Sequence, residues 1–268
     1  PGGVIVDLEA IAKIAQEAEV PLIVDNTMAT PWLCRPFEWG ADLVVHSTTK
    51  FLSGQGNAMG GIVIDSGRFP WFGNAKYPSL SEPCPDYNGL TFAETFGDMA
   101  FTLYSHAVSL RDLGCTQSPM NAWITLNGVE TLPLRMERHV ENAQKVAGFL
   151  QQHPSVEWVS YAGLSSSPYY QLAQKYLQGK AGSVFTFGIR GGYESGLRLL
   201  EKVELFSHVS NIGDSRSLIL HPASTTHRQL SDEQRLTAGA GPEVIRLSVG
   251  IESAEDLIAD LEQALEGL

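Results

Sequence analysis

An alternation of helix and strand signals near the start of the chain constrains its fold more than any other feature. Asp7 is a favourable N-cap, and apolar residues at helical spacing continue over residues 7–19. Two short apolar runs follow at residues 20–25 and 42–46, separated by a turn or short helix at residues 34–40. Strands that alternate with helices form parallel sheets, because the helices supply the crossover connections. The sequence therefore predicts an α/β fold with a mostly parallel sheet.

Polar residues stand where these two strands end. Asp25 closes the first strand, and Ser47, Thr48, Thr49 and Lys50 follow the second. In a parallel sheet the carboxyl ends of the strands line the ligand crevice, so Asp25 and Lys50 should face one site. A lysine beside a buried strand is costly unless it has a partner or a chemical role, and lysine forms Schiff bases with carbonyl compounds.

This set of residues suits a cofactor that carries both an aldehyde and a phosphate. Ser47 and Thr49 would bind the phosphate, whereas Thr48 would leave the strand on the opposite face. Asp25 would keep a pyridine nitrogen protonated, and Lys50 would first hold the aldehyde and then carry protons. Pyridoxal 5'-phosphate (PLP) combines these groups. On these residues alone, the alternative that Lys50 is a surface lysine after a strand, with the hydroxyls as turn residues, stays open.

Several longer segments resemble one family, the Cys/Met-metabolism PLP-dependent enzymes, which are relatives of cystathionine gamma-synthase. The resemblance runs from Pro1 almost to the last residue, and its motifs are specific in combination. Residues 72–88, 118–139 and 211–230 look most like the O-acetylhomoserine sulfhydrylase branch of that family. The segments that carry the family resemblance are VDNTMATP (24–31), ADLVVHSTTKF (41–51), SPMNA (118–122), GVETLPLRM (128–136), HPASTTH (221–227) and RLSVGIE (246–252).

The resemblance implies a fold-type I PLP-dependent transferase. Residues 1–130 would be the carboxyl-terminal part of a large PLP-binding domain, and residues 131–268 a smaller α+β domain. The implied reaction is γ-replacement on O-acetyl-L-homoserine by sulfide or a thiol, which gives homocysteine or methionine plus acetate. Two alternatives stay open: γ-elimination of the methionine or cystathionine gamma-lyase type, and a PLP-binding fragment that is catalytically incomplete.

Three further residues have predicted roles around the substrate and cofactor. Arg246 lies inside the apolar strand signal at residues 244–249, where an arginine needs an anion. The resemblance implies that Arg246 holds the substrate α-carboxylate, with a structural salt bridge as the alternative. It places Asn211 where relatives contact the same carboxylate. Thr27 would support the cofactor, although a turn hydroxyl explains it equally well.

The rest of the chain predicts a second set of helices and strands. Residues 68–92 indicate a long surface excursion, and residues 98–112 a helix that stops at Gly114. A helix is expected to begin after Ser253, with Asp256 in a variant capping box. The remaining expected elements are a long helix at residues 131–152 and strands at residues 156–161, 183–189, 217–220 and 244–249.

Composition limits the partners. A net charge of −12 argues against nucleic acids and anionic membranes, which bind basic surfaces. No apolar run approaches the length of a membrane span, and no signal peptide opens the chain. The 3 cysteines have no CxxC spacing, which favours free thiols in a cytoplasmic protein. His221 and His227 lack the neighbouring ligands that a metal site would need, so we expect no metal.

The beginning of the sequence, Pro1-Gly2-Gly3, lacks an initiator methionine. In the family a long segment precedes this point and supplies a glycine turn for the phosphate and a tyrosine that stacks on the cofactor. We therefore expect this sequence to be the carboxyl-terminal piece of a longer enzyme. Relatives form tetramers with active sites between subunits, so the resemblance also implies a homotetramer.

Overall fold

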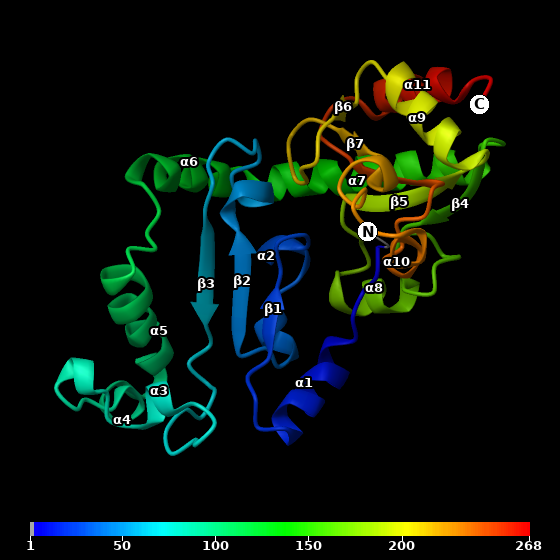
Figure 1. Ribbon diagram of the computed structural model, residues 1–268. Helices are drawn as coiled ribbons and strands as arrows, with labels where there is room; N and C mark the ends of the chain where they lie inside the picture. The colour runs from blue at the N-terminus through cyan, green and yellow to red at the C-terminus, as the bar shows by residue number, and fades with distance from the viewer. Residues whose placement is uncertain (1–2) are drawn as a thin grey trace.

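The structure is a computed structural model that describes residues 3–268, so Pro1 and Gly2, where the expectation about the chain's start falls, lie outside the described residues. It contains two sheets, and helices α6 and α7 run along the same side of both (Figure 1). The elements up to residue 112 are α1 (Leu8–Glu17), β1 (Ile23–Asp25), α2 (Thr30–Leu33), η1 (Pro36–Trp39), β2 (Leu43–Ser47), η2 (Thr48–Leu52), β3 (Gly61–Asp65), α3 (Pro78–Ser81), η3 (Pro85–Tyr87), α4 (Phe92–Phe96), η4 (Gly97–Met99), α5 (Ala100–Tyr104) and η5 (Ser105–Asp112). The later elements are α6 (Pro119–Glu130), α7 (Leu132–Gln152), β4 (Val156–Ser160), α8 (Tyr170–Tyr176), β5 (Val184–Ile189), α9 (Gly192–Lys202), β6 (Ser207–His208), β7 (Leu218–Leu220), η6 (Pro222–Ser224), α10 (Asp232–Thr237), β8 (Val244–Ser248) and α11 (Ala254–Leu265).

Helix α1 and the two strands that follow it match the expectation from the sequence. Asp7 caps the helix, because its Oδ1 accepts a hydrogen bond from the backbone N–H of Ala10 at 3.2 Å. Strands β1 and β2 pair in parallel, with Ile23 opposite Leu43. The predicted α/β class and its parallel pair are therefore confirmed.

The third strand differs from the parallel expectation. Strand β3 pairs with β2 antiparallel, with Ser47 opposite Gly61. The chain returns from β2 to β3 through a tight turn and a glycine-rich loop, and this connection has no crossover helix to bring it back in parallel. The first sheet is therefore mixed, in the order β1-β2-β3.

Residues 68–112 form a separate aromatic cluster beside the first sheet. Its rings include Phe69, Trp71 and Phe92, and the Trp71 ring stacks on Phe101 with centroids 5.7 Å apart. The helix expected over residues 98–112 is helical throughout but irregular, since a 3-10 turn, an α-helical turn and a π-helical turn follow one another. Gly114, with a φ of 73°, ends it as predicted.

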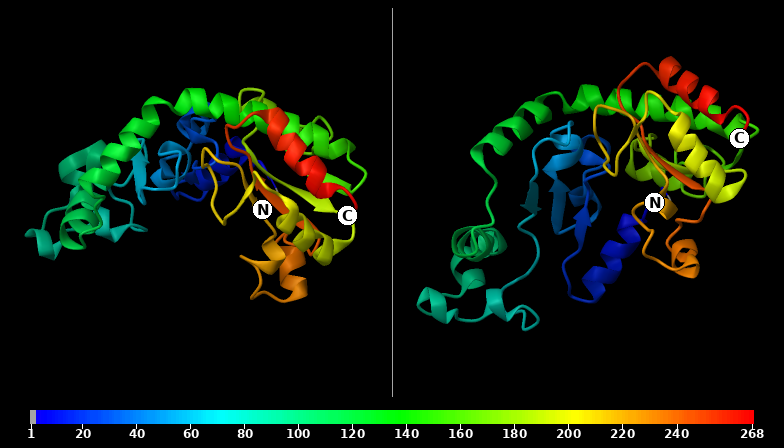
Figure 2. Two further views of the ribbon diagram at one scale, coloured as in Figure 1. Left: turned by 90° about the horizontal axis from the view of Figure 1, so that it is seen from above. Right: turned by 45° about the horizontal axis from the view of Figure 1, so that its top comes forward.

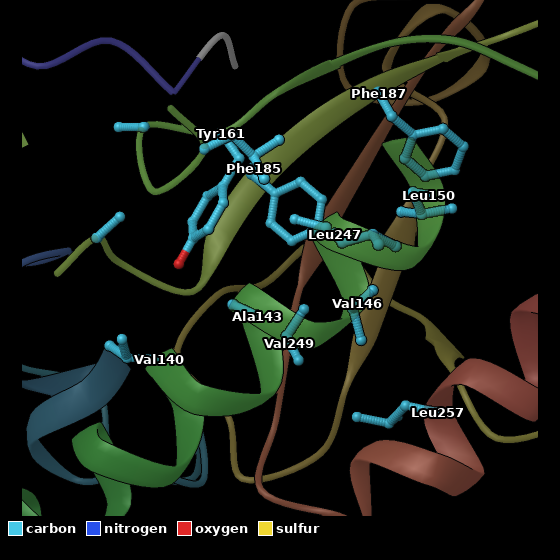
Figure 3. Close-up of a cluster of buried hydrophobic side chains, with 14 of the residues drawn as sticks. Val140, Ala143, Val146, Leu150, Tyr161, Phe185, Phe187, Leu247, Val249 and Leu257 are labelled. Carbon is cyan, nitrogen blue, oxygen red and sulfur yellow. The ribbon is translucent and has the colours of Figure 1, made fainter. Parts of the chain in front are cut away.

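The second sheet has the order β4-β5-β8-β7-β6 and is antiparallel except for the β6–β7 pair. All four strands expected in this half are present, and β6 is an addition. Helix α7 packs its apolar side against the sheet, as Figure 3 shows. The side chains that meet there include Val140, Ala143, Val146, Leu150, Phe185, Phe187 and Leu247.

Two long helices connect the sheets. Helix α6 was not predicted from the sequence. It begins at Pro119, and Ser118 is its N-cap, since Ser118 Oγ accepts a hydrogen bond from Asn121 N at 3.2 Å. Helix α7 then runs for 21 residues, as expected for residues 131–152. The two form an arch over both sheets (Figure 2). The domain boundary predicted between residues 130 and 131 falls where α6 gives way to α7 and stays a prediction.

Candidate active site

A cavity of about 550 Å³ lies where β1 and β2 end. Asp25, Thr27, Ser47 and Lys50 line it from the first sheet. Residues from the second half of the chain, Tyr161, Tyr176, Val184 and Ile212 among them, line it as well. The structure thus brings four predicted residues to one cavity between the two sheets.

A larger cavity, of about 830 Å³, lies between α1 and residues 68–76. None of the predicted site residues lines it. We place the candidate site in the smaller cavity, because that one holds the lysine and the carboxylate that sequence reasoning selected.

Hydrogen bonds connect the ends of β1 and β2. The Asp25 carboxylate accepts from the backbone N–H of Thr27 at 3.0 Å, which fixes the direction of the carboxylate. Thr27 Oγ1 in turn accepts from the backbone N–H of Ser47 at 2.8 Å. Thr27 therefore connects Asp25, at the end of β1, to Ser47, at the end of β2. Residues 48–54, which follow Ser47, form what we call the lysine turn.

His46 is the buried ionisable group next to this connection. Its side chain is buried, and its Nδ1 has no hydrogen-bond partner among the described residues. Burial lowers the pKa of His46, while the charge of Asp25 raises it. The imidazole is therefore neutral at physiological pH and adds no positive charge beside Asp25.

Lys50 lies at a kink in the lysine turn. Its φ and ψ of −89° and −127° are not helical, although the turn around it has π-helical hydrogen bonding. Its ammonium Nζ donates to Asn211 Oδ1. Among the residues that the structure describes, no carboxylate pairs with Lys50, so its amine is free of an ion pair.

The hydroxyl residues of the turn face different surroundings. Ser47 lines the cavity, whereas Thr49 Oγ1 bonds the backbone of Gly60 at 3.1 and 3.3 Å and does not line the cavity. Thr48 is buried, and its Oγ1 lacks a partner within residues 3–268. Thr48 and Thr49 belong to a turn rather than a strand, so strict alternation of faces does not apply to them.

Arg246 is half-buried in β8 and has no ion pair with any residue that the structure describes. Its Nη2 donates to the backbone carbonyl of Asn211 at 3.2 Å. Burial lowers the pKa of the Arg246 guanidinium. Arg246, Asn211 and Lys50 therefore form one connected chain of contacts, and the salt bridge considered as an alternative for Arg246 is not found in the described residues.

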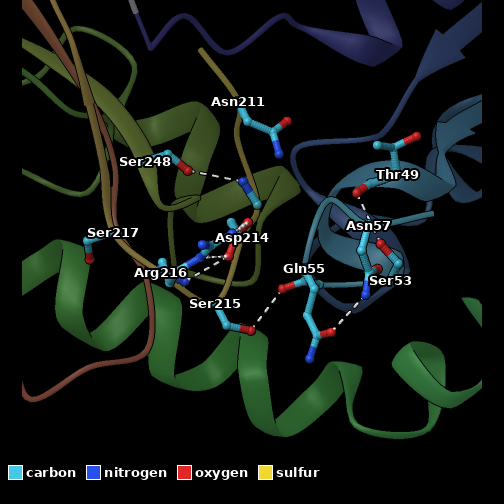
Figure 4. A network of polar contacts seen from close by, with 12 residues as sticks. Thr49, Ser53, Gln55, Asn57, Asn211, Asp214, Ser215, Arg216, Ser217 and Ser248 are labelled. Atoms are coloured by element: carbon cyan, nitrogen blue, oxygen red, sulfur yellow. Dashed lines mark hydrogen bonds and ion pairs between the residues drawn. The ribbon is translucent and has the colours of Figure 1, made fainter. Parts of the chain in front are cut away.

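The segment that carries Asn211 packs directly on the lysine turn (Figure 4). Ser215 donates to Gly54 O from both its N–H and its hydroxyl, each at 2.8 Å. Gly213 N donates to Ser248 Oγ at 3.0 Å, which anchors the segment to β8. Sequence reasoning missed this contact, and no local signal marks it, because Gly54 and Ser215 are 161 positions apart.

The expectations about metals and membranes can be compared with the described residues. In residues 3–268 no group of three or more His, Cys, Asp and Glu side chains could hold a metal ion. Both ring nitrogens of His221 are taken, by Ser224 Oγ at 3.0 Å and by Pro242 O at 2.9 Å. Within the same range no helix combines the length and apolarity needed to cross a membrane.

Comparison with known proteins places the chain in a family. It is 51% identical to an O-acetyl-L-homoserine sulfhydrylase from Leptospira meyeri, over 98% of this chain and 61% of that protein. It is 46% identical to a homocysteine synthase from Schizosaccharomyces pombe, over 97% of this chain and 61% of that one. The chain thus spans about three fifths of the length of these relatives.

A solved structure shows the same fold. A Campylobacter jejuni protein described as an O-acetylhomoserine (thiol)-lyase, with a pyridoxyl group on a lysine, matches 100% of this chain and 64% of its own. The TM-score is 0.95 at 43% identity, which confirms the predicted fold class. Residues 1–266 match the family described as Cys/Met metabolism PLP-dependent enzyme. The chain belongs to the Cys/Met metabolism PLP-dependent enzyme family.

Proposed function

We propose that the protein containing this chain is a PLP-dependent O-acetylhomoserine sulfhydrylase. It replaces the γ-acetyloxy group of O-acetyl-L-homoserine with sulfide or a thiol, and it releases acetate. The observation that carries the proposal is the chain of contacts from Lys50 through Asn211 to Arg246. An amine and a guanidinium lie close together there, and neither has a carboxylate partner among residues 3–268. An amino-acid substrate supplies a carboxylate for the guanidinium of Arg246 and a proton that the amine of Lys50 can take up.

The residues fit PLP on three counts. Lys50 lines the cavity, and its amine, which has no carboxylate partner among the described residues, can bond to the cofactor aldehyde. The Asp25 carboxylate, oriented by Thr27 N–H, can accept a hydrogen bond from a ring nitrogen. Ser47 brings a hydroxyl to the same wall for the phosphate, and Thr27 holds the backbone of Ser47 in place. When bound, PLP supplies an electron-poor ring that stabilises negative charge at the substrate Cα.

Each residue then has a task at a stated atom. Arg246 binds the substrate α-carboxylate, ideally through two parallel hydrogen bonds, and so fixes the Cα–H bond relative to the site. Lys50 Nζ takes the Cα proton and later returns a proton. Asn211 Oδ1 holds Nζ in the resting site. From the sequence, Asn211 is expected to contact the substrate carboxylate. We keep that role for its amide nitrogen, because its Oδ1 accepts from Lys50 Nζ.

We assign Thr49 a supporting role in phosphate binding. Its hydroxyl is shared with Gly60 N–H and Gly60 C=O, so it orders the loop beside Ser47. This proposal for Thr49 rests on its position two residues from Ser47 rather than on a place in the cavity wall.

The cofactor site can be tested by chemical trapping. Borohydride treatment of the full-length protein with PLP, followed by digestion and mass spectrometry, should place a pyridoxyl group on Lys50. Lys50→Ala should abolish both the label and turnover. Lys13→Ala, which removes an exposed lysine of α1, serves as control and should keep both. Near-normal turnover in Lys50→Ala would overturn the assignment.

The reaction type can be tested by product analysis. Acetate release from O-acetyl-L-homoserine should rise with sulfide concentration, and homocysteine should form in equal amount. Release of acetate together with ammonia at a rate that sulfide does not change would instead identify γ-elimination.

Quaternary structure, location and domain division complete the proposal. We propose a homotetramer with sites between subunits, and apolar side chains on the exposed side of α6, namely Met120, Trp123 and Leu126, support further contacts. The 3 free cysteines support a cytoplasmic location. We propose that the smaller domain begins at residue 131, next to the first residue of α7.

A further inference from the structure

Arg135, in the first turns of α7, bonds the backbone of the lysine turn. Its Nη1 donates to Phe51 O at 2.8 Å, and its Nη2 donates to Leu52 O at 3.3 Å. Nη2 also donates to Gly128 O at 2.7 Å, and Nε to Thr131 Oγ1 at 3.2 Å. One guanidinium thus connects the carbonyl end of the lysine turn to the carbonyl end of α6.

Within the five residues centred on Lys50, the carbonyls of Phe51 and Leu52 are the two that accept from Arg135 rather than from a donor of the turn itself. The carbonyls of residues 48, 49 and 50 accept from Ser53 N, Ser53 Oγ and Gly54 N, at 3.0, 3.0 and 2.8 Å. The carbonyls of Phe51 and Leu52 point away from these donors and go to Arg135 instead. Because buried backbone acceptors need partners, Arg135 completes the hydrogen bonding of the five residues centred on Lys50.

Among the described residues, the guanidinium donates to backbone carbonyls and one hydroxyl. No carboxylate pairs with Arg135 in the part of the chain that the structure describes, and burial lowers its pKa. It also lies against the backbone of Gly54, where a Cβ would come within 2.5 Å of Nη1. Gly54 has a φ of 81°, so both its conformation and this close approach require glycine.

The backbone at Lys50 departs from the conformation of the turn around it. Its φ and ψ of −89° and −127° fall outside the helical region that its neighbours occupy. The contacts on the carboxyl side of Lys50 include those of Arg135 with Phe51 O and Leu52 O. Gly128 also packs closely on Ser53, and Ser215 bonds Gly54 O.

We propose that Arg135 is a positioning residue that fixes the direction of the Lys50 amine by binding the carbonyls of Phe51 and Leu52. This inference rests on the proposed function, in which Lys50 holds the cofactor. Arg135 does not line the cavity that Lys50 lines. Its planar fork reaches two carbonyls of the turn and one of α6 at once, which the single ammonium of a lysine cannot do.

The test uses Arg135→Ala and Arg135→Lys in the full-length PLP-loaded protein. Arg138→Ala is the matched control, since Arg138 lies on the same helix, is exposed and pairs with Glu141 at 3.9 Å. Thr131→Val removes the Nε contact and the bond from Thr131 Oγ1 to Gly128 O at 3.2 Å, and it leaves the contacts of Arg135 with Phe51 O and Leu52 O in place. The measurements are hydrogen exchange of residues 48–57, visible circular dichroism of the bound cofactor, and kcat and KM for O-acetyl-L-homoserine.

We expect exchange of residues 48–57 to accelerate about tenfold or more in Arg135→Ala, because the carbonyls lose their partner. The cofactor dichroism should weaken, and kcat should fall about tenfold or more while KM stays within about twofold. Arg135→Lys should show the same changes to a smaller degree. Arg138→Ala and Thr131→Val should match the parent protein in all three measurements.

Parent-like exchange and dichroism in Arg135→Lys and Arg135→Ala would overturn the inference. If Arg135→Ala does not fold, Arg135→Lys alone decides between the two outcomes. The exchange measurement works equally well without PLP, so it separates this inference from the proposed function. Failure of borohydride to label Lys50 in the parent protein would overturn the proposed function, whatever the exchange result.

Discussion

At the scale of single residues, Arg246 carries a positive charge that no ion pair within the described residues neutralises. It is half-buried, it donates to one backbone carbonyl, and no carboxylate of the described residues reaches it. Removing it should cost substrate binding rather than cofactor binding, because its proposed ligand is the substrate carboxylate.

We predict that Arg246→Ala lowers kcat/KM about a hundredfold or more, consistent with a loss of roughly 2–5 kcal/mol for a buried charge pair. PLP content, measured by absorbance after desalting, should stay near one per chain. Arg246→Lys should recover part of the loss, since it keeps the charge but not the bidentate geometry. A collapse of PLP content with unchanged kinetics in the remaining holoenzyme would show that Arg246 is structural.

His139 gives a prediction about pH. It is fully buried on α7, its Nδ1 bonds Val249 O at 2.7 Å, and its Nε2 has no partner among residues 3–268. The pKa of His139 is lowered to about 4, and burial is the main cause. The hydrogen bond with Val249 O and the charge of Asp214 oppose this shift, whereas the charge of Arg135 adds to it. The neutral ring is therefore the form that the folded protein holds.

Between the folded pKa of about 4 and the unfolded value near 6.5, the unfolded chain binds the additional proton. The free energy of unfolding should therefore fall as pH drops through this window, by at most roughly 3 kcal/mol from this residue. Urea denaturation at several pH values checks this, with His139→Gln expected to flatten the slope. His106→Gln, which removes an exposed imidazole, is the control. An unchanged slope in His139→Gln would refute the assignment.

At the scale of elements, the contact between α6 and the lysine turn depends on a missing side chain. A Cβ on Gly128 would lie 2.3 Å from Leu52 O and 2.6 Å from Ser53 O. Backbone atoms cannot move aside as a flexible side chain can, so the helix and the turn would have to separate. Gly148, on α7, has nothing within 4 Å of the same position.

We therefore predict that Gly128→Ala destabilises the fold by about 2 kcal/mol or more and weakens PLP retention. Gly148→Ala should be neutral or stabilising by up to about 1 kcal/mol, because alanine favours helices. Thermal unfolding and PLP dissociation rates measure both effects. Equal stability of the two variants would mean that the packing of α6 against the lysine turn does not stabilise the fold.

Elements with strong local signals could be predicted from the sequence, whereas their partners could not. The cap at Asp7 and the apolar runs before Asp25 and Ser47 depend on neighbouring residues, so α1, β1 and β2 were expected. The antiparallel direction of β3 depends on the path of the connecting loop, which periodicity does not encode. The turn geometry at Lys50 is likewise set by residues more than eighty positions away, as the 84-residue separation between Arg135 and Phe51 illustrates.

The same distinction holds for the candidate site. Lys50 and Asp25 stand out locally, as polar residues that end apolar strands. Arg135 lies within a motif that carries the family resemblance, yet only its contacts suggest a task for it. Its one local signal is its spacing on α7, one position before the buried Met136 and three after the buried Leu132.

At the scale of the whole molecule, both edge strands of the first sheet carry exposed apolar side chains. Strands β1 and β3 are both edges of a three-stranded sheet, since the order is β1-β2-β3. The exposed fractions of Ile23, Ile62 and Val63 are 55%, 47% and 56%. Unpaired strand edges with exposed apolar residues invite association with other chains.

We predict that a protein beginning at Pro1 associates through these edges and holds PLP weakly, although Lys50, Asp25 and Arg246 are all present. The curated relatives are longer, as this chain spans 61% of two of them, and additional residues of that extent could cover β1 and β3. The measurement compares this protein with one that carries the additional length of the relatives, by light scattering, PLP content and specific activity. Val63→Lys, at an exposed position of β3, should reduce association in the shorter protein, while the same change should destabilise the longer one. Equal activity and PLP content in the two proteins would show that the first sheet needs no further cover and that the site in this chain is sufficient for catalysis.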